Sequence, residues 1–427
     1  MRKTELGSSN MKSSSKKRIG KAFSISVLNQ IISSATNFGI NIILVRTLSK
    51  TEFGLYGICF AALLFITGIT DSLLTTQMVV LSPEKPEGQR KIFATSVYEL
   101  VVLTTFGIAV LLLLGSHLLS PFSSTVANFL PYIYPLAFAS LFFSVKFFFL
   151  RYFYSIKKEI YAFVTNLILS ICVFLLFVAD WVLTSKITLF EAIFYYGLAH
   201  LIAIVAAHHL SRFKHFPRSA TRIKDALGDT WKGGKWASIT NVAFFLRIQA
   251  HTLIVASTID IAGVAQMNAA RLFVTPGLLL IPAVCQIALP RMADIRAYNI
   301  HAFKKSGIFL SIAFLSGMSL YVIALMLLWP FIQSIVGETY HNIGGIVQIW
   351  CLFGAAIALR NSLEVMVQSL KEFKFHLSAN LIGTVITLVS VTFFSKLWSI
   401  SGAILGLFTG EICLAVFYFY RIQKLVR

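Results

Sequence analysis

The chain has 427 residues, of which 57% are hydrophobic and only 13% are charged, and its mean hydropathy is +0.79. A soluble core does not require so large an apolar fraction, so the composition excludes a soluble globular protein and predicts an all-α, multi-pass membrane protein. The formal net charge of +20 would suit a nucleic-acid-binding protein, but the positions of the basic residues, given below, argue against that class.

Twelve apolar stretches follow a polar, basic segment, and as helices they are long enough to cross a bilayer core of ~30 Å. Most connections between them are short, which favours antiparallel neighbours in a helical bundle. The predicted spans are 22–45, 55–80, 93–119, 129–150, 160–183, 187–209, 236–258, 262–288, 306–330, 343–368, 376–395 and 398–420.

One long polar stretch divides the chain near its midpoint and leaves six predicted spans on each side. Its charges and its Pro and Gly residues predict a cytoplasmic linker. The predicted organisation is therefore a basic N-terminus at 1–21, an N-terminal six-helix lobe at 22–209, the linker at 210–235, a C-terminal six-helix lobe at 236–420 and a basic tail at 421–427.

The basic residues predict the orientation of the spans. Of the 37 Lys and Arg residues, 29 lie in the two ends of the chain and in the connections on the same side of the membrane as those ends. The opposite connections hold only four, which are Arg46, Lys50, Lys186 and Lys396. Lys and Arg concentrate on the cytoplasmic side of membrane proteins, so both termini are predicted to be cytoplasmic. The excess charge then contacts anionic membrane lipid, and no nucleic-acid partner is expected.

The first predicted span carries a polar stripe, since Gln30, Asn37 and Asn41 recur at helical spacing together with two serines. Unsatisfied amides in hydrocarbon cost several kcal/mol, so the stripe must face other helices or a water-filled cavity. Both interpretations remain open: the amides join helices, or they contact a substrate.

Three arginines lie inside predicted spans, where a charge costs at least ~2.5 kcal/mol on insertion scales. Arg360 lies one turn before Glu364, and the two can pair on one helix. Arg247 and Arg271 have no acidic residue one turn away, so their counter-charges come from elsewhere in the fold or from a ligand. Because a guanidinium binds phosphate oxygens in a bidentate manner, these arginines favour an anionic lipid headgroup over a cationic drug.

Carboxylates inside the spans are the candidates for coupling transport to an ion, H⁺ or Na⁺. Asp71, Glu99 and Glu364 are predicted to take this role, because burial favours the protonated form of a carboxyl group. Glu411 lies near the middle of the last span, and Lys146 lies close enough to a helix end to reach the interface.

The segment from Arg46 to Gly57, RTLSKTEFGLYG, follows the first span with an Arg, a Leu, an acidic residue, an aromatic residue, Gly and Leu-Tyr. This pattern resembles the loop between the first two helices of bacterial oligosaccharide flippases of the Wzx type. That family belongs to the larger group that includes the lipid II flippases and the MATE drug exporters. Val336 to Tyr340 and Ala288 to Pro290 also fit the family pattern.

The resemblance implies a function as well as a fold. Flippases of this family have two six-helix lobes around a cationic central cavity. By alternating access they move a polyprenyl-diphosphate-linked oligosaccharide from the cytoplasmic to the outer leaflet of the bacterial plasma (inner) membrane. The products feed cell-surface polysaccharides such as O-antigen, so other assembly proteins are expected partners. The candidate substrate-binding residues are Arg46, Arg247, Arg271, Arg360, Gln30, Asn37 and Asn41.

Two other functions compete with this one. A MATE-like cation or drug antiporter is the alternative transporter, but buried arginines disfavour a cationic substrate. A membrane-embedded glycosyltransferase or O-antigen polymerase is the enzyme alternative, and it would require charged outer loops, which are short and nearly uncharged in this chain. The sequence holds no DxD pair, Ser/His/Asp grouping or metal-ligand cluster, and its five cysteines lie apart in apolar segments. We therefore expect a transporter without catalytic residues, metal or cofactor.

Overall fold

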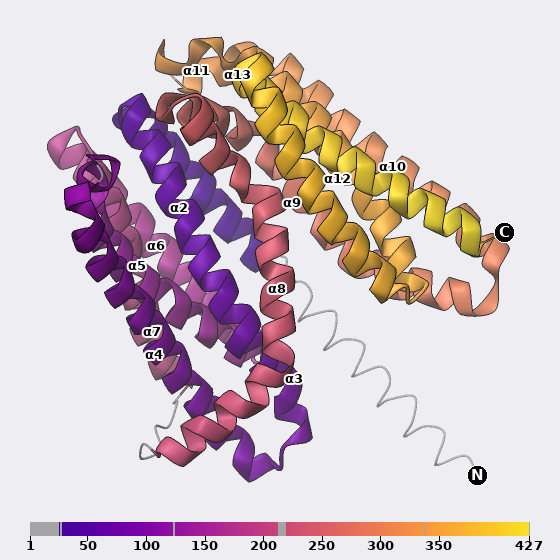
Figure 1. Ribbon diagram of the computed structural model, residues 1–427, viewed down its shortest axis with the longest axis horizontal. Helices are drawn as coiled ribbons and strands as arrows, with labels where there is room; N and C mark the ends of the chain where they lie inside the picture. The colour runs from indigo at the N-terminus through magenta and orange to yellow at the C-terminus, as the bar shows by residue number, and fades with distance from the viewer. Residues whose placement is uncertain (1–24, 26–27, 123, 212–218, 337, 427) are drawn as a thin grey trace. The chain divides into compact units, whose positions relative to one another are not determined.

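The computed structural model describes residue 25 and residues 28–122, 124–211, 219–336 and 338–426, and these form helices and turns without a β-strand (Figure 1). The first helix runs from Leu28 to Thr47. A π-helix at Asp71–Thr75 joins α2 to α3, and 3₁₀ turns occupy Ser82–Glu84, Ser120–Phe122 and Glu338–Ile343. The remaining bounds are α2 (Lys50–Thr70), α3 (Thr76–Leu81), α4 (Glu87–Leu119), α5 (Ser124–Ser155), α6 (Glu159–Thr184), α7 (Leu189–Ser211), α8 (Ala220–Thr258), α9 (Ile261–Tyr298), α10 (Ile300–Leu327), α11 (Trp329–Val336), α12 (Gly344–Ser369) and α13 (Phe373–Leu425).

Eleven helices of the described chain are long and apolar enough to cross a membrane. The last of them, Lys374–Leu425, has 52 residues, about twice the length that a bilayer requires. Its backbone leaves the helical conformation at Trp398 and at Ser399, which has a φ of 54°. The element therefore supplies two spans, and the predicted all-α membrane fold is confirmed.

Local side-chain signals determine where the helices begin. Ser49 and Glu52 form a reciprocal capping box at the start of α2, in which each backbone N–H donates to the other side chain at 3.1 and 3.2 Å. Thr188 and Glu191 repeat this arrangement at the start of α7. Asn299 accepts hydrogen bonds from two backbone N–H groups at the start of α10. These caps explain why α2, α7 and α10 begin where they do.

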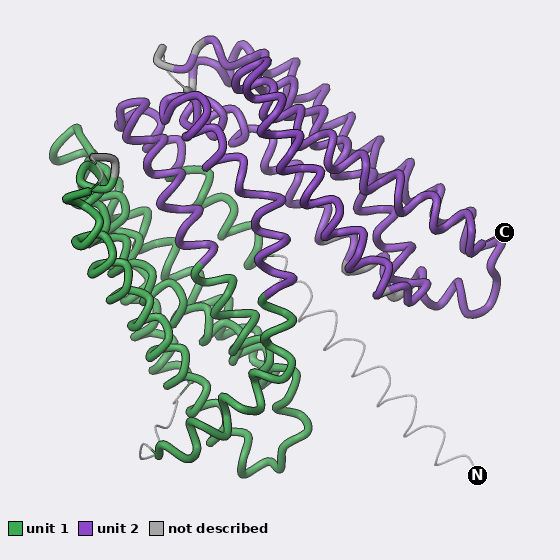
Figure 2. The backbone as a smooth tube through the Cα atoms, in the orientation of Figure 1, with its two compact units in different colours: residues 1–40, 66–238 green, residues 41–65, 239–427 purple. Residues whose placement is uncertain are grey.

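The chain forms two compact units (Figure 2): residues 1–40 with 66–238, and residues 41–65 with 239–427. In the first unit α5 packs against α4 and α7, and the aromatic rings of Phe148, Phe149 and Phe153 are completely buried in its core. In the second unit α12 packs against α9, α10 and α13. The division differs from the predicted lobes, because residues 41–65 group with the C-terminal half and residues 236–238 group with the N-terminal half.

Glycines explain why the part of α2 up to Phe65 belongs to the second unit. A Cβ atom on Gly54 would lie 2.1 Å from the Ile261 carbonyl oxygen, and one on Gly57 would lie 2.3 Å from Asn268 Nδ2. The glycines of the RTLSKTEFGLYG segment therefore allow α2 to approach α9 closely.

Residues 220–235, which the sequence assigns to the linker, are helical and form the first part of α8. The glycines in this stretch favour a loop on propensity, but they have a packing role here. A Cβ on Gly234 would lie 2.4 Å from the Leu73 carbonyl oxygen, and one on Gly233 would lie 2.5 Å from Gln77 Oε1. Both glycines thus lie against the π-helix region. Pro217 lies outside the described residues.

Candidate functional site

The second unit brings four charged side chains of the spans together, from α8, α12 and α13. Arg360 donates a hydrogen bond from Nε to Glu411 and one from Nη1 to Glu364. Arg360 and Glu411 are only 6% and 3% exposed. The predicted pairing of Arg360 with Glu364 is present, and Glu411, 51 residues further along the chain, forms a second ion pair with the same arginine.

Arg247 lies in the same group, and it is 3% exposed. Its Nη1 donates to Asn380 Oδ1 at 2.6 Å, and its Nε, which has no hydrogen-bond partner among the described residues, lies 3.7 Å from Glu411 Oε1. Its counter-charge therefore comes from the fold, as one of the two predicted sources allows. With both carboxylates ionised, the two arginines and two glutamates have no net charge.

Three further polar side chains extend this group, and the sequence did not single them out. The Tyr418 hydroxyl lies 2.9 Å from His376 Nδ1 and accepts a hydrogen bond from Asn380 Nδ2 at 2.9 Å. His376 Nε2 lies 3.5 Å from a carboxylate oxygen of Glu364. The i, i+4 spacing of His376 and Asn380 on an apolar helix is the signal that could have identified them. We call these seven residues, Arg247, Arg360, Glu364, His376, Asn380, Glu411 and Tyr418, the ion-pair network.

Arg271 on α9 differs from the arginines of the network. Its Nη1 donates to Gln249 Oε1 at 3.2 Å, and its Cζ lies 5.5 Å from the centre of the Trp350 ring. Trp350 is fully buried and donates from Nε1 to the Met267 carbonyl oxygen at 3.1 Å, which fixes the ring. Within the described chain, no carboxylate oxygen lies within 4.0 Å of this guanidinium. An amide and an aromatic face partly replace its hydration, but neither neutralises its charge.

His251 lies one turn after Arg247 on α8, and its ring meets the Trp350 ring edge-on with centroids 5.9 Å apart. The side chain is 1% exposed, and neither ring nitrogen has a hydrogen-bond partner among the described residues. Two polar side chains thus contact the Trp350 ring: the Arg271 guanidinium lies over its face, and the His251 ring lies edge-on to it.

The polar stripe of the first helix is divided between the two units. In the first unit, Asn37 Oδ1 accepts a hydrogen bond from the Tyr196 hydroxyl at 3.2 Å, and exposed Gln30 donates to Ser34 Oγ at 3.4 Å. Asn29, which the helical spacing did not select, is buried and accepts from Asn166 Nδ2 at 2.7 Å. The stripe thus includes helix–helix contacts in this unit.

Asn41 and Arg46 belong to the second unit. Asn41 is half-buried, and Arg46, in the last turn of the first helix, is exposed and donates from Nη2 to the Ser334 carbonyl oxygen at 3.2 Å. Of the seven candidate substrate-binding residues, five therefore lie in the second unit, while Gln30 and Asn37 lie in the first.

The carboxylates of the first unit have contrasting surroundings. Asp71 accepts two hydrogen bonds from Arg151, at 3.0 and 2.7 Å, and one from Thr76 at 3.2 Å. Glu99 is 6% exposed, and its Oε2 has no hydrogen-bond partner among the described residues. Lys146 is buried on α5, so the prediction that its side chain reaches the interface is wrong.

A family model described as "Polysaccharide biosynthesis protein" matches residues 19–296, which is well over half of the chain. The chain belongs to this family of polysaccharide biosynthesis proteins. The resemblance to Wzx-type flippases, which the sequence carries in the segment from Arg46 to Gly57, is thereby confirmed. Among curated proteins, none matches the chain.

Solved structures of transporters share the fold of this family member. A multidrug resistance MATE family transporter of the MOP superfamily, in an inward-facing conformation, aligns over 92% of this chain and 94% of its own, with a TM-score of 0.75 and 14% identity. A MOP superfamily transporter from Pyrococcus furiosus aligns over 96% of both chains, with a TM-score of 0.67 and 13% identity. The MATE transporter VcmN from Vibrio cholerae, in a mutant form, aligns over 97% and 98%, with a TM-score of 0.64 and 14% identity. These identities establish the fold alone, which is that of multi-pass membrane transporters.

Proposed function

We propose that this protein is a flippase that moves a polyprenyl-diphosphate-linked oligosaccharide from the cytoplasmic to the outer leaflet of a bacterial plasma membrane. Its family membership supports a role in polysaccharide biosynthesis, and its fold is that of transporters. The observation that carries the proposal is the environment of Arg271, a guanidinium without a carboxylate partner in the described chain.

The charge of Arg271 suits a diphosphate substrate. The ion-pair network is neutral as a whole, so Arg271 contributes net positive charge to the second unit. Gln249 accepts from one Nη1 hydrogen, and this leaves guanidinium donors for two phosphate oxygens. The Trp350 ring under the guanidinium holds its plane in place before the substrate arrives. The remaining candidates, Arg46, Gln30, Asn37 and Asn41, are proposed to contact the diphosphate or the sugars.

Arg271 is tested by measuring transport and folding separately. In proteoliposomes, an impermeant lectin reports how much lipid-linked oligosaccharide has crossed the bilayer. Loss of one charged hydrogen-bonding partner costs ~1.5–3 kcal/mol, so Arg271→Ala should weaken substrate binding about ten- to hundredfold while the protein still folds. Arg271→Lys should keep part of the activity, because it retains the charge and loses the planar fork. Full transport by a stable Arg271→Ala variant would refute the proposal.

A MATE-like cation antiporter is the second candidate, because the solved structures with this fold include MATE transporters and because Glu364 and Glu411 are carboxylates inside the spans. The same proteoliposomes separate the two functions. A flippase translocates the lipid-linked oligosaccharide and leaves a fluorescent organic cation where it was added. Under the antiporter hypothesis, a proton or sodium gradient drives the cation out, and Arg271→Ala improves its binding by removing a repulsive charge.

A further inference from the structure

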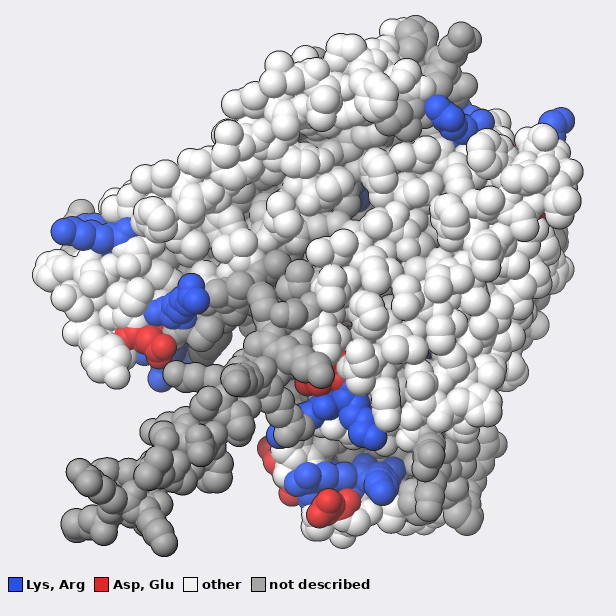
Figure 3. Space-filling model, turned by 180° about the vertical axis from the view of Figure 1, so that it is seen from behind, with Lys and Arg blue, Asp and Glu red and all other residues white. Residues whose placement is uncertain are grey.

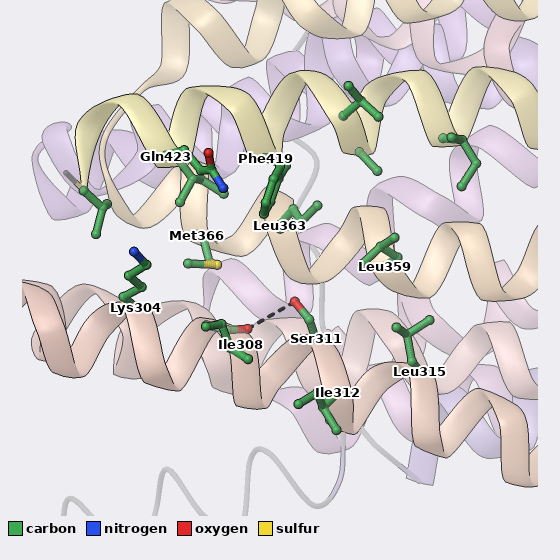
Figure 4. Close-up of a pocket in the computed structure, with 16 residues that line it drawn as sticks. Lys304, Ile308, Ser311, Ile312, Leu315, Leu359, Leu363, Met366, Phe419 and Gln423 are labelled. Carbon is green, nitrogen blue, oxygen red and sulfur yellow. Dashed lines mark hydrogen bonds between the residues drawn. The ribbon is translucent and has the colours of Figure 1, made fainter.

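A groove lies along the second unit between α10, α12 and α13, and its volume is about 750 Å³ (Figure 4). One wall carries Ile308 and Ile312 of α10, and the opposite wall carries Val416 and Phe419 of α13. These four apolar side chains are each 51–57% exposed, so the groove opens onto the surface of the unit. An apolar surface of this kind is stable against lipid chains and unfavourable against water.

The floor of the groove is apolar because its polar groups already have partners. The Ser311 hydroxyl donates to the Gly307 carbonyl oxygen at 3.1 Å, which Figure 4 shows as a dashed line, and it lies 2.8 Å from Ser362 Oγ. Met366 closes the floor beside Gly307, where a Cβ atom would lie 2.1 Å from the methionine Cε. The floor therefore offers hydrocarbon contacts and no free hydrogen-bonding group that would select a polar ligand.

One end of the groove is cationic. Lys304 and Gln423 line that end, and no carboxylate oxygen of the described residues lies within 4.0 Å of the lysine. The positive-inside pattern places this end at the cytoplasmic interface, together with the α12–α13 turn and the end of α13. On the face in Figure 3, charged side chains form a few separate groups and most of the surface is uncharged.

The length of the groove matches one leaflet. Lys304 and Leu315 lie at its two ends on α10, eleven residues apart, which corresponds to about 16 Å of helix rise. Half of a ~30 Å hydrocarbon core is about 15 Å, so an acyl chain that starts at the interface fills the groove and ends near the bilayer centre. A polyprenyl carrier chain is much longer than one leaflet and would not fit this length.

We propose that this groove is a binding site for an anionic phospholipid of the inner leaflet, with one acyl chain along α10 and α13 and the headgroup phosphate at Lys304. The argument uses the shape and charge of the second unit and does not depend on what the protein transports. An attraction of ~1 kcal/mol between one lysine and an anionic headgroup corresponds to about a fivefold preference over a zwitterionic lipid.

Native mass spectrometry of the full-length protein in detergent tests the site, with phosphatidylglycerol and phosphatidylethanolamine added at equal concentrations. We expect about a fivefold preference for phosphatidylglycerol, which Lys304→Glu should abolish. Lys305→Glu is the matched control, because it changes a neighbouring exposed lysine that does not line the groove. Equal binding of both lipids, or an equal loss in both variants, would overturn the proposal, since general surface charge would then explain the binding.

A second pair of variants tests the acyl chain. Ile312→Trp fills the groove and should remove the tightly bound phospholipid, whereas Phe309→Trp alters an exposed residue of the same helix outside the groove and should not. Val416→Trp repeats the test from the opposite wall if the first variant does not fold. Phospholipid binding that survives both groove-filling variants would refute the site. If these variants instead removed only bound polyprenyl phosphate, the occupant would be the carrier chain and the proposal would be wrong.

Discussion

Replacement of Glu411 is the sharpest test of the ion-pair network. In Glu411→Gln the side chain keeps its shape and loses its charge, so Arg247 and Arg360 are left with Glu364 as the only carboxylate of the network. Removing one member of a buried ion pair typically destabilises a protein by ~3–5 kcal/mol, because an uncompensated charge stays buried. Glu411 and both arginines are at most 6% exposed, so solvent screening should reduce this cost little.

The matched variants separate charge from packing. Arg247→Met combined with Glu411→Gln leaves the adjacent Arg360–Glu364 pair and restores a neutral network, so most of the lost stability should return. Asp229→Asn removes one partner of a partly exposed ion pair with Lys85, and exposed pairs contribute only ~0–1 kcal/mol. The assay is the free energy of unfolding in mixed micelles titrated with a denaturing detergent. A cost below ~1 kcal/mol for Glu411→Gln, or a double variant no more stable than the single one, would refute this account.

Three further predictions concern other polar groups. Arg151→Ala should lower the free energy of unfolding by only about 1 kcal/mol, because the arginine side chain is 41% exposed and Asp71 keeps its hydrogen bond from Thr76. A loss of stability comparable to that of Glu411→Gln would contradict this prediction. Glu99→Gln should leave the protein at least as stable, because an amide costs less to bury than a carboxylate oxygen without a partner in the described chain. It should also abolish any ion dependence of transport if Glu99 couples the ion, and unchanged ion dependence would exclude that role. Burial raises the pKa of the Tyr340 hydroxyl, so its contribution to stability is complete below pH ~10 and is lost as the pH rises further. Tyr340→Phe should therefore flatten the alkaline decline in unfolding free energy, and an unchanged decline would assign it to other groups.

The sequence predicted the elements of this fold well because their signals are local. Apolar runs of the length of a bilayer predicted the spans, but the predicted starts at residues 55 and 306 lie after the capped starts of α2 at Lys50 and α10 at Ile300. The Arg360–Glu364 pair could also be predicted from the sequence, because i, i+4 spacing places both residues on one helix face.

The predictions that failed depended on contacts between residues far apart in the sequence. Glu411 lies 164 residues after Arg247 and its contact depends on how α8 and α13 pack, which one sequence does not encode as a pattern. Gly233 and Gly234 indicated a loop by propensity, but their contacts with the π-helix region show that they serve close helix packing. Lys146 was misjudged because helical position predicts depth and does not predict which neighbours cover a side chain.

The free energy of binding a phosphate differs between the arginines that already form an ion pair and Arg271. A phosphate that binds Arg247 or Arg360 competes with a carboxylate that already neutralises the guanidinium, and breaking such a buried pair costs ~3–5 kcal/mol. The new charged hydrogen bond returns only ~1.5–3 kcal/mol, so the exchange is unfavourable unless the freed carboxylate finds another partner. Arg271 has no such pair to break within the described chain, and its Gln249 and Trp350 contacts persist when a phosphate binds. In this fold, the positions of the carboxylates therefore determine which buried arginines remain available to an anionic substrate, and Arg271 is the one that we expect substrate to contact.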